Sequence, residues 1–475
     1  MPITSVHPQY SVNTDRWLKN RAACAGQDEV KRLATLFLPD DNETDRSETA
    51  RQRYNRYLLR ATWMPVSGYT KQGLIGMVMR RAPEVVLPAQ IEYTLENADG
   101  AGLSLDQVAK QVLAEVIEVG RVGLMVDYPA APVGLSAEQV AALGLAAKVT
   151  LYRAEAIDNW RIQNIGGALR LTMVKLCEMA SVEKDDYMLD YEKRYRVLKL
   201  VDGVYTQTLY DEADNQIGDV IVPRQANGQP WGHIPFHIVG ATTNNPEIDQ
   251  ALISGIVDLN TSHYQMSADS AKNLHIHSGG TLVISSDMSN EQWQAYNPQG
   301  VTVGADQGLF LGQQGSAQLL QLDPAQAVEA KLTSIETQMV AVGAHLISDR
   351  TRTDTAEAAR IDAAGKASAL STAVGNVSEG IEAALEDMTR FMGGEAEEVR
   401  FQLNQQFYPE NVDAQTVMAM IQLLDRQVIA VKDVRSKLRG GGLIAQNRTD
   451  EDIDDETDAV GFDLGSVALD DELEA

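Results

Sequence analysis

The apolar positions along the chain change period several times, and each change marks a predicted element. Residues 103–119 carry apolar side chains at steps of three and four and are followed by Gly120, which predicts an amphipathic helix and its C-terminal end. The same spacing predicts a helix over 16–38 and another around Tyr54 and Tyr57. The N-terminal part of the chain is therefore predicted to be mainly helical.

From about residue 148 to residue 239 the sequence becomes rich in β-forming residues. Asp202 and Gly203 lie between two such runs, a signal typical of a tight type I′ hairpin turn. Gly166 and Gly167 separate another pair of runs. The pattern predicts an antiparallel, β-rich layer after the helical one.

A long helix is predicted over 246–277, beginning near Pro246. Its apolar stripe recurs at steps of three and four and consists of Ile248, Leu252, Ile256, Leu259, His263 and Met266. After Gly279 and Gly280 the pattern is extended again, at 281–284, 301–303 and 309–311. This small β-containing insert ends at residues 323–324, where an Asp-Pro pair signals the start of another helix.

The helix predicted over 324–347 has the most regular apolar pattern in the chain. Its seam repeats at alternating steps of four and three and consists of Val328, Leu332, Ile335, Met339, Val342 and Leu346. A seam of this kind needs a helical neighbour, and in a ring adjacent subunits supply neighbours. A short polar stretch, 348–354, then precedes an alanine-rich helix predicted over 355–392.

The last eighty residues predict a strand over 399–407, a helix over 413–438 and a glycine hinge at 440–442. Residues 449–475 contain twelve acidic side chains and no basic one. This composition predicts a tail that is disordered or only transiently structured.

Composition and charge narrow the class of protein. The 475 residues carry a formal net charge of −27 and are 44% hydrophobic, which excludes a wholly disordered or collagen-like chain. The acid excess disfavours a tight nucleic-acid binder, which needs clustered Lys and Arg. No run approaches about 18 consecutive apolar residues, and the N-terminus lacks the features of a signal peptide. We therefore expect no membrane-spanning helix and synthesis inside the cell.

The sequence offers no catalytic, cofactor-binding or metal-ligating constellation, and we expect no enzyme activity. Five of the seven histidines lie close together: His233, His237, His263, His275 and His277. Their spacing fits no metal motif, so packing or subunit contact is their expected role. Cys24 and Cys177 are expected to be reduced and buried.

The order of these elements resembles that of the portal proteins of tailed bacteriophages. Two short phrases add to the likeness. The run Asp258-Leu259-Asn260-Thr261-Ser262-His263-Tyr264 is similar to the portal segment in the first stem helix. The run Thr355-Ala356-Glu357-Ala358 is similar to the start of the long portal helix. The resemblance covers almost the whole chain.

The resemblance implies an α+β portal fold with an α/β wing, a two-helix stem, a small β-containing clip, a long wing helix and a helical crown. The implied divisions are a wing over 1–245, stem helices over 246–277 and 324–347, a clip over 278–323, a long wing helix over 355–392, a crown over 393–448 and an acidic tail over 449–475. The implied tunnel loop, facing DNA, consists of Ser348, Asp349, Arg350, Thr351, Arg352, Thr353 and Asp354.

The resemblance also implies a function. Such a protein forms a ring, of twelve subunits in the assembled family, at one capsid vertex of the virion. Double-stranded DNA passes through the ring during packaging and ejection, without tight binding in a chain this acidic. The implied partners are further copies of the chain, major capsid and scaffolding proteins, the terminase and a head-tail adaptor, with no membrane involved. No cofactor is implied.

Two other interpretations remain open from the sequence. One is a metal-dependent hydrolase or nuclease, which requires a clustered carboxylate or histidine site. The other is a self-assembling virion adaptor that lacks a DNA channel.

Overall fold

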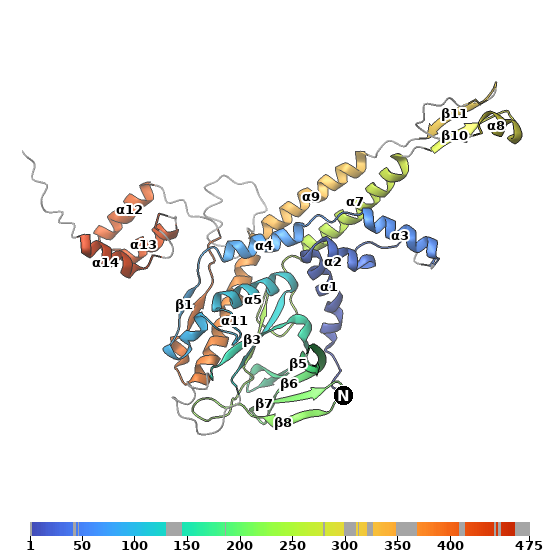
Figure 1. Ribbon diagram of the computed structural model, residues 1–475. Coiled ribbons are helices and arrows are strands. Elements are labelled where there is room, and N and C mark those ends of the chain that lie inside the picture. The colour runs from blue at the N-terminus through green and yellow to red at the C-terminus, as the bar shows by residue number, and fades with distance from the viewer. Residues whose placement is uncertain are drawn as a thin grey trace, which may run out of the picture. The chain divides into compact units, whose positions relative to one another are not determined.

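The computed structural model describes residues 2–40, 44–45, 47–129, 145–185, 187–278, 281–298, 310–311, 313–320, 326–347, 368–407, 414–440, 443–444 and 448–460. The fold is α+β (Figure 1). The chain forms two compact units. The first contains Met1–Ile75 and Glu84–Gln402, and the second contains Gly76–Pro83 and Leu403–Ala475.

Four helices open the chain, namely α1 (Pro8–Ala25), α2 (Gln27–Arg32), α3 (Glu48–Arg60) and α4 (Val66–Val78). A 3₁₀ turn, η1 (Ala34–Leu36), follows α2. The single helix predicted over 16–38 is wrong at Gly26, whose φ of 106° breaks it into two. The helix predicted around Tyr54 and Tyr57 is confirmed as α3.

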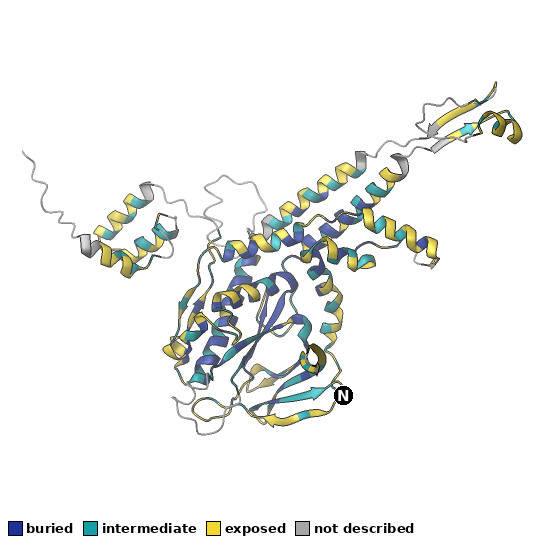
Figure 2. Ribbon diagram, viewed as in Figure 1, coloured by how far each residue is buried: buried dark blue, intermediate teal, exposed yellow. Residues whose placement is uncertain are grey.

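A three-stranded antiparallel sheet lies at the centre of the first unit. Its strand order is β3 (Lys148–Arg153), β2 (Arg121–Asp127) and β9 (Phe236–Gly240). Two helices, α5 (Leu105–Val119) and α11 (Ala369–Met392), pack on this sheet and on each other, and Figure 2 shows their buried faces. At Gly380 of α11 a Cβ would lie 2.3 Å from Val239 Cγ2, so only glycine permits this close approach of helix and strand.

Helix α5 is confirmed where local signals predicted it. Ser104 and Gln107 form a capping box at its start, and Gly120 ends it with a left-handed φ of 80°. Two further elements, β1 (Glu84–Val86) and η2 (Ala89–Leu95), precede it.

A five-stranded antiparallel meander forms the second sheet. It contains β4 (Ile157–Ile165), β5 (Ala168–Asp185), β6 (Met188–Val201), β7 (Val204–Asp211) and β8 (Gln216–Ile221), in that order. A short η3 (Ala154–Ala156) links β3 to β4. The predicted turn between β6 and β7 is confirmed, because Asp202 and Gly203 have φ values of 50° and 79°.

Two long helices, α7 (Ser254–Ser278) and α9 (Gln326–Ile347), run side by side as a hairpin (Figure 1). Between them lie β10 (Thr281–Ser285), α8 (Asn290–Tyr296) and β11 (Ser316–Leu320), with β10 and β11 paired antiparallel. The sequence did not predict α8, which begins at a capping box of Ser289 and Gln292. Of the other predicted strands in this insert, 301–303 lies outside the described residues, and residues 310–311 are not in a strand.

Two predicted helix starts are wrong. Helix α7 begins at Ser254 instead of Pro246, because the Asp249 carboxylate accepts hydrogen bonds from the backbone N–H groups of Thr242 and Thr243 and holds a loop there.

One continuous helix over 355–392 is excluded by Ser368, which has an extended backbone and caps α11 by accepting a hydrogen bond from the Ser371 N–H. Residues 355–367 lie outside the described part of the chain.

The second unit contains α12 (Ala414–Asp425), α13 (Val431–Gly440) and α14 (Asp450–Val460). Its C-terminal part begins after Gln402, because β12 (Arg400–Gln402) pairs with β1 in the first unit. The single helix predicted over 413–438 is wrong, since it is interrupted at Gln427, whose φ is 58°.

The acidic tail, which the composition predicted to be disordered or only transiently structured, contains α14 in its first part. The Thr449 hydroxyl caps α14 by accepting the Asp452 N–H at 3.0 Å, and three acidic residues fill the first turn, where the helix dipole favours negative charge. Arg435 Nη2 lies 2.5 Å from Asp454 Oδ1, and Arg439 pairs with Asp450. Residues 461–475 are outside the described part of the chain.

Candidate functional site

The predicted seam of the second stem helix faces α7 of the same chain. Ile335 and Met339 are each 3% exposed, and Val328, Leu332 and Val342 are half-buried. Leu346 lies in α9, but its side chain is outside what the structure describes.

Two glycines mark where the helices meet, at distances where an added Cβ would make ordinary van der Waals contacts. A Cβ at Gly255 of α7 would lie 3.7 Å from Val342 Cγ1, and one at Gly343 of α9 would lie 4.0 Å from Ile256 Cδ1. The helical neighbour that the seam requires is thus supplied within one chain, whereas the ring interpretation had assigned that role to adjacent subunits. The hairpin can form in a single subunit.

Outside the seam, the described part of the hairpin has a polar contact between its helices and exposed apolar side chains. His263 Nε2 of α7 lies 3.2 Å from Glu336 Oε1 of α9, which adds a polar contact beside the seam. On the side away from the seam, Val340 is 74% exposed, and Leu274 toward the outer end of α7 is 60% exposed. These surfaces are available to other molecules.

The inner half of α7 is fixed to the N-terminal helices. Asn260, which is fully buried, donates from Nδ2 to the Met64 carbonyl oxygen at 3.0 Å and to Ser67 Oγ at 3.2 Å. Tyr264 is also fully buried and packs edge-on against Trp63. The segment that carries the portal-like phrase, residues 258–264, is therefore the segment that attaches α7 to the body.

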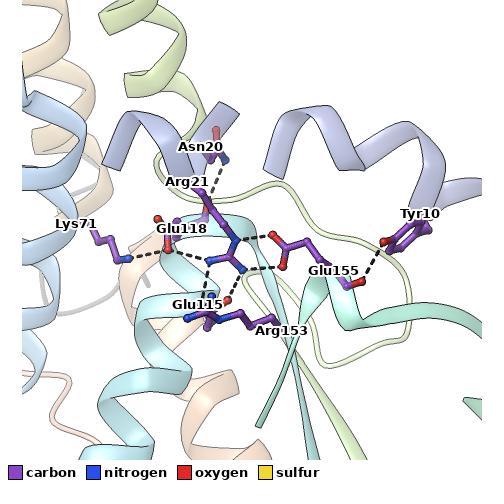
Figure 3. Close-up of polar contacts among 8 residues, drawn as sticks. All are labelled: Tyr10, Asn20, Arg21, Lys71, Glu115, Glu118, Arg153 and Glu155. Carbon is purple, nitrogen blue, oxygen red and sulfur yellow. Dashed lines mark hydrogen bonds and ion pairs between the residues drawn. The ribbon is translucent and has the colours of Figure 1, made fainter. Parts of the chain in front are cut away.

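A cluster of ionic side chains lies at the start of α7, and we call it the Arg21 cluster: Arg21, Lys71, Glu115, Glu118, Arg153 and Glu155 (Figure 3). Arg21 reaches three carboxylates. Its Nη2 lies 2.7 Å from Glu115 Oε2, its Nη1 lies 3.2 Å from Glu118 Oε2, and it also pairs with Glu155. Lys71 of α4 bonds Glu118 at 2.7 Å. The cluster joins α1, α4, α5 and η3.

The electrostatics of the cluster follow from its burial. Burial by itself would lower the pKa of the Arg21 guanidinium, but hydrogen bonds to Glu155 and Glu115 outweigh it and raise that pKa. Burial also opposes ionisation of Glu155, yet its bonds with Arg21 hold the pKa of that carboxyl below its ordinary value. Burial beside Glu118 raises the pKa of the Cys24 thiol to about 12, so this thiol is protonated and unreactive.

Asn20 links the Arg21 cluster to the hairpin. Its Nδ2 donates to the Glu118 carbonyl oxygen at 3.0 Å and to Ser254 Oγ, in the first turn of α7, at 3.2 Å (Figure 3 draws the former bond). Sequence reasoning missed this site. The sequence did contain one signal for it. Glu115 and Glu118 are three positions apart on a helix that has buried residues on every side.

A second buried polar site lies where α11 crosses β9. The Asp387 carboxylate, 1% exposed, has Oδ2 at 2.9 Å from His237 Nε2 and 3.1 Å from His233 Nε2, and Oδ1 at 2.7 Å from Arg390 Nη1. Although burial would raise the pKa of Asp387, the hydrogen bonds from His233 and His237 hold it well below its usual range. Both histidines serve to pack α11 on the sheet.

The remaining predicted residues do not form a site in the described structure. His275 lies in α7, as does His277, whose side chain is outside what the structure describes. Within the described residues, no group of three or more His, Cys, Asp or Glu side chains is arranged to hold a metal ion. The predicted tunnel loop, 348–354, lies outside the described part of the chain. None of the described helices is both long and apolar enough to cross a membrane.

Comparison with known proteins gives one family match. Residues 253–392 match a family described as a domain of unknown function, DUF4055. The match begins one residue before α7 and ends at the last residue of α11. The hairpin, the small β insert and the following helix therefore recur together in other proteins, although the match covers under a third of this chain.

Among solved structures, this protein is similar to a chain described as "Neck of empty GTA particle computed with C6 symmetry". The two share 12% sequence identity, and the match covers 79% of this chain and 90% of that chain with a TM-score of 0.39. A TM-score this low supports no functional argument. No match to a curated protein was found.

Proposed function

We propose that this protein is the portal subunit of a tailed bacteriophage. Copies of it form a ring at one capsid vertex of the virion, and double-stranded DNA passes through the ring during packaging and ejection. The observation that carries the proposal is the hairpin of α7 and α9, which has a small β insert at one end and is anchored to an α+β body at the other.

The position of the anchors supports this role. The first turn of α7 is held through Asn20, and its next two turns are held through Asn260 and Tyr264. Beyond that point α7 packs on α9 and on α3, where the Tyr57 hydroxyl donates to Asp269 and Lys272 lies over the Tyr57 ring. A rigid hairpin with exposed flanks suits a ring, in which each subunit contacts the next through different surfaces and the contacts close by rotation.

The proposed mechanism is mechanical and uses no covalent chemistry. The ring is a conduit, and an excess of carboxylates on its subunits repels phosphates, which lets DNA slide. In this proposal the clip, residues 278–323, docks the terminase during packaging and a head-tail adaptor afterwards. Capsid and scaffolding proteins contact the outer surface of the ring.

Electron microscopy of the purified full-length protein in negative stain tests the proposal. We expect rings with a central hole, twelve-fold if the number follows the resembled family. Closed assemblies without a hole would favour a virion adaptor, and monomers at every concentration would contradict any ring. A metal-dependent cut of DNA by the purified protein would favour a nuclease instead.

The tunnel loop gives a second test of the proposal. Its place, residues 348–354, rests on the resemblance alone. Deletion of residues 349–353 should leave rings intact in the microscope and reduce the amount of DNA packaged or retained in particles. Loss of the rings themselves would show that this segment serves assembly.

A further inference from the structure

One part of the five-stranded sheet has no neighbouring strand. Strand β4 pairs with β5 only as far as Leu176, and β7 pairs with β6 only as far as Arg194. Strands β5 and β6 continue to pair with each other as far as Asp185 and Met188. We call residues 178–193 the ribbon, a two-stranded extension whose edges pair with no other described strand.

One face of the ribbon carries uncovered apolar side chains beside Ser181, Glu183 and Lys193. Directly paired residues of an antiparallel ladder share a face, and so do alternate residues of one strand. Ser181 pairs with Tyr191 and Glu183 with Leu189, which places Met179, Leu189 and Tyr191 on the face that continues from Tyr195. Tyr195 is 2% exposed, but Met179, Leu189 and Tyr191 are 61%, 56% and 59% exposed.

Exposed apolar side chains on an isolated two-stranded ribbon indicate a missing partner. Two strands alone are only marginally stable in water, and clustered apolar side chains on a surface mark contact sites. The tip adds to this surface, since Tyr187 is fully exposed and Met188 is 55% exposed. The partner must cover apolar side chains at a distance from the core of the ribbon's own subunit.

The charge of the ribbon defines the partner further. Residues 178–193 contain six acidic and two basic side chains. A matching surface must therefore be basic and must also offer apolar contact. In a chain with a net charge of −27, such a surface is uncommon.

Helix α3 has both properties. It carries four arginines against one glutamate. One face packs inward, with Ala50 buried and Tyr54 bonded through its hydroxyl to the Leu38 carbonyl oxygen. The opposite face exposes arginines and a leucine that is 74% exposed, and consists of Arg53, Arg56, Leu59 and Arg60.

We propose that the ribbon of one copy docks on the exposed face of α3 of the neighbouring copy. The apolar side chains around Tyr191 cover Leu59, and Glu183, which lies on the same face of the ribbon, meets Arg53 and Arg56. Different surfaces of two copies meet, which is the head-to-tail contact that builds a ring. This inference rests on the proposed function, because the ring supplies the neighbouring copy.

Charge reversal tests the docking in the full-length protein. The ribbon variant is Glu183→Arg, and the helix variant is Arg53→Glu with Arg56→Glu. All three residues are exposed, so each variant should fold, which circular dichroism checks. Either variant should raise the concentration needed for assembly about tenfold or more, since like charges then meet at every contact. Mass photometry gives the fraction of assembled protein.

Recombining the two changes gives a result that a general loss of stability cannot produce. An equimolar mixture of the two variants should assemble again, because alternating copies bring opposite charges together at each contact. A chain carrying all three substitutions should also assemble. Asp219→Arg, an exposed reversal on β8, is the matched control and should assemble like the unaltered protein.

The other outcomes are equally decisive. Rings that form normally from both variants overturn the docking while leaving the proposed function intact, whereas an unaltered protein that never self-associates overturns both. Failure of Asp219→Arg to assemble would place the contact at the edge of β8. Normal rings of the helix variant that retain less DNA would mean that α3 faces DNA, which also overturns the docking.

Discussion

The two ends of α7 are held in different ways. The inner end is surrounded by its own chain. Ile256, Val257 and Tyr264 are fully buried, and Asn260 is hydrogen-bonded to Ser67 of α4 and to Met64 just before that helix. The outer end exposes Leu274, and close to it Asp269 and Lys272 contact Tyr57 of α3. The inner end is therefore determined within the subunit, and the outer end leaves surface for partners. Substitutions should separate these two roles.

The largest effect is expected at the base of the hairpin. Arg21→Ala leaves Glu115 and Glu118, which are 7% and 6% exposed, without their central cation. Breaking a buried ionic network in this way costs about 3–5 kcal/mol of unfolding free energy. Urea unfolding followed by circular dichroism measures it. Arg32→Ala, at an exposed pair with Glu29, is the control and should change nothing measurable. Equal stability of both variants would mean that the Arg21 cluster does not secure the base.

A second substitution addresses the middle of the hairpin. Ile335→Asp, alone or with Leu332→Asp, puts a carboxylate into the contact of α9 with α7 and should cost about 2–4 kcal/mol. Hydrogen exchange should show lost protection in both helices. Val340→Asp, on the exposed side of the same helix, should leave exchange unchanged. Similar behaviour of the two aspartates would contradict a seam buried within one subunit.

A smaller effect is expected from one hydrogen-bonding side chain at the inner end. Asn260→Ala removes the donor for the Met64 carbonyl oxygen and for Ser67, at a cost of about 1–3 kcal/mol. Asn273→Ala, the same change on the exposed outer part of α7, should be neutral in urea unfolding. Comparable losses at both positions would remove the distinction between the two ends.

The smallest effect concerns acid. The folded-state pKa values of Glu155 and Asp387 lie below their ordinary values of 4.5 and 3.8. Each carboxylate therefore stabilises the folded state at a pH above its ordinary pKa. This contribution is lost as the pH falls through the lower pKa of the folded state. Unfolding free energy should decline below about pH 4.5, and the decline should be shallower in Arg21→Ala, where Glu155 has lost its partner. An unchanged slope in that variant would contradict the assigned cause.

Local signals in the sequence predicted local structure well. Helix α5 has its capping box and its terminal glycine within one short segment, and the turn at Asp202 and Gly203 needs only two residues. The pairing of α7 with α9 was implied by the regular seam, although the sequence could not say whose helix would fill it. The α+β class followed from the same patterns.

Contacts between distant positions were the part that the sequence did not predict. Arg21 meets Glu115 and Glu155 across 94 and 134 positions, and no periodicity links residues so far apart. The charge count of the C-terminal segment predicted disorder because it ignored Arg435 and Arg439, which pair with α14. At residues 246–253 the helical period is present, but the hydrogen bonds accepted by Asp249 favour a loop.

The filling of the α9 seam by α7 has a consequence for the order of events in a cell. The hairpin can form within one chain, at a rate that does not depend on how many copies surround it. In the proposed ring, joining of copies is a later step whose rate rises with concentration. Dilution should thus halt growth while leaving a reservoir of folded subunits. In such a scheme the number of rings depends on how often the growth of a ring starts. A surface that nucleates this growth once per particle would limit each particle to one ring.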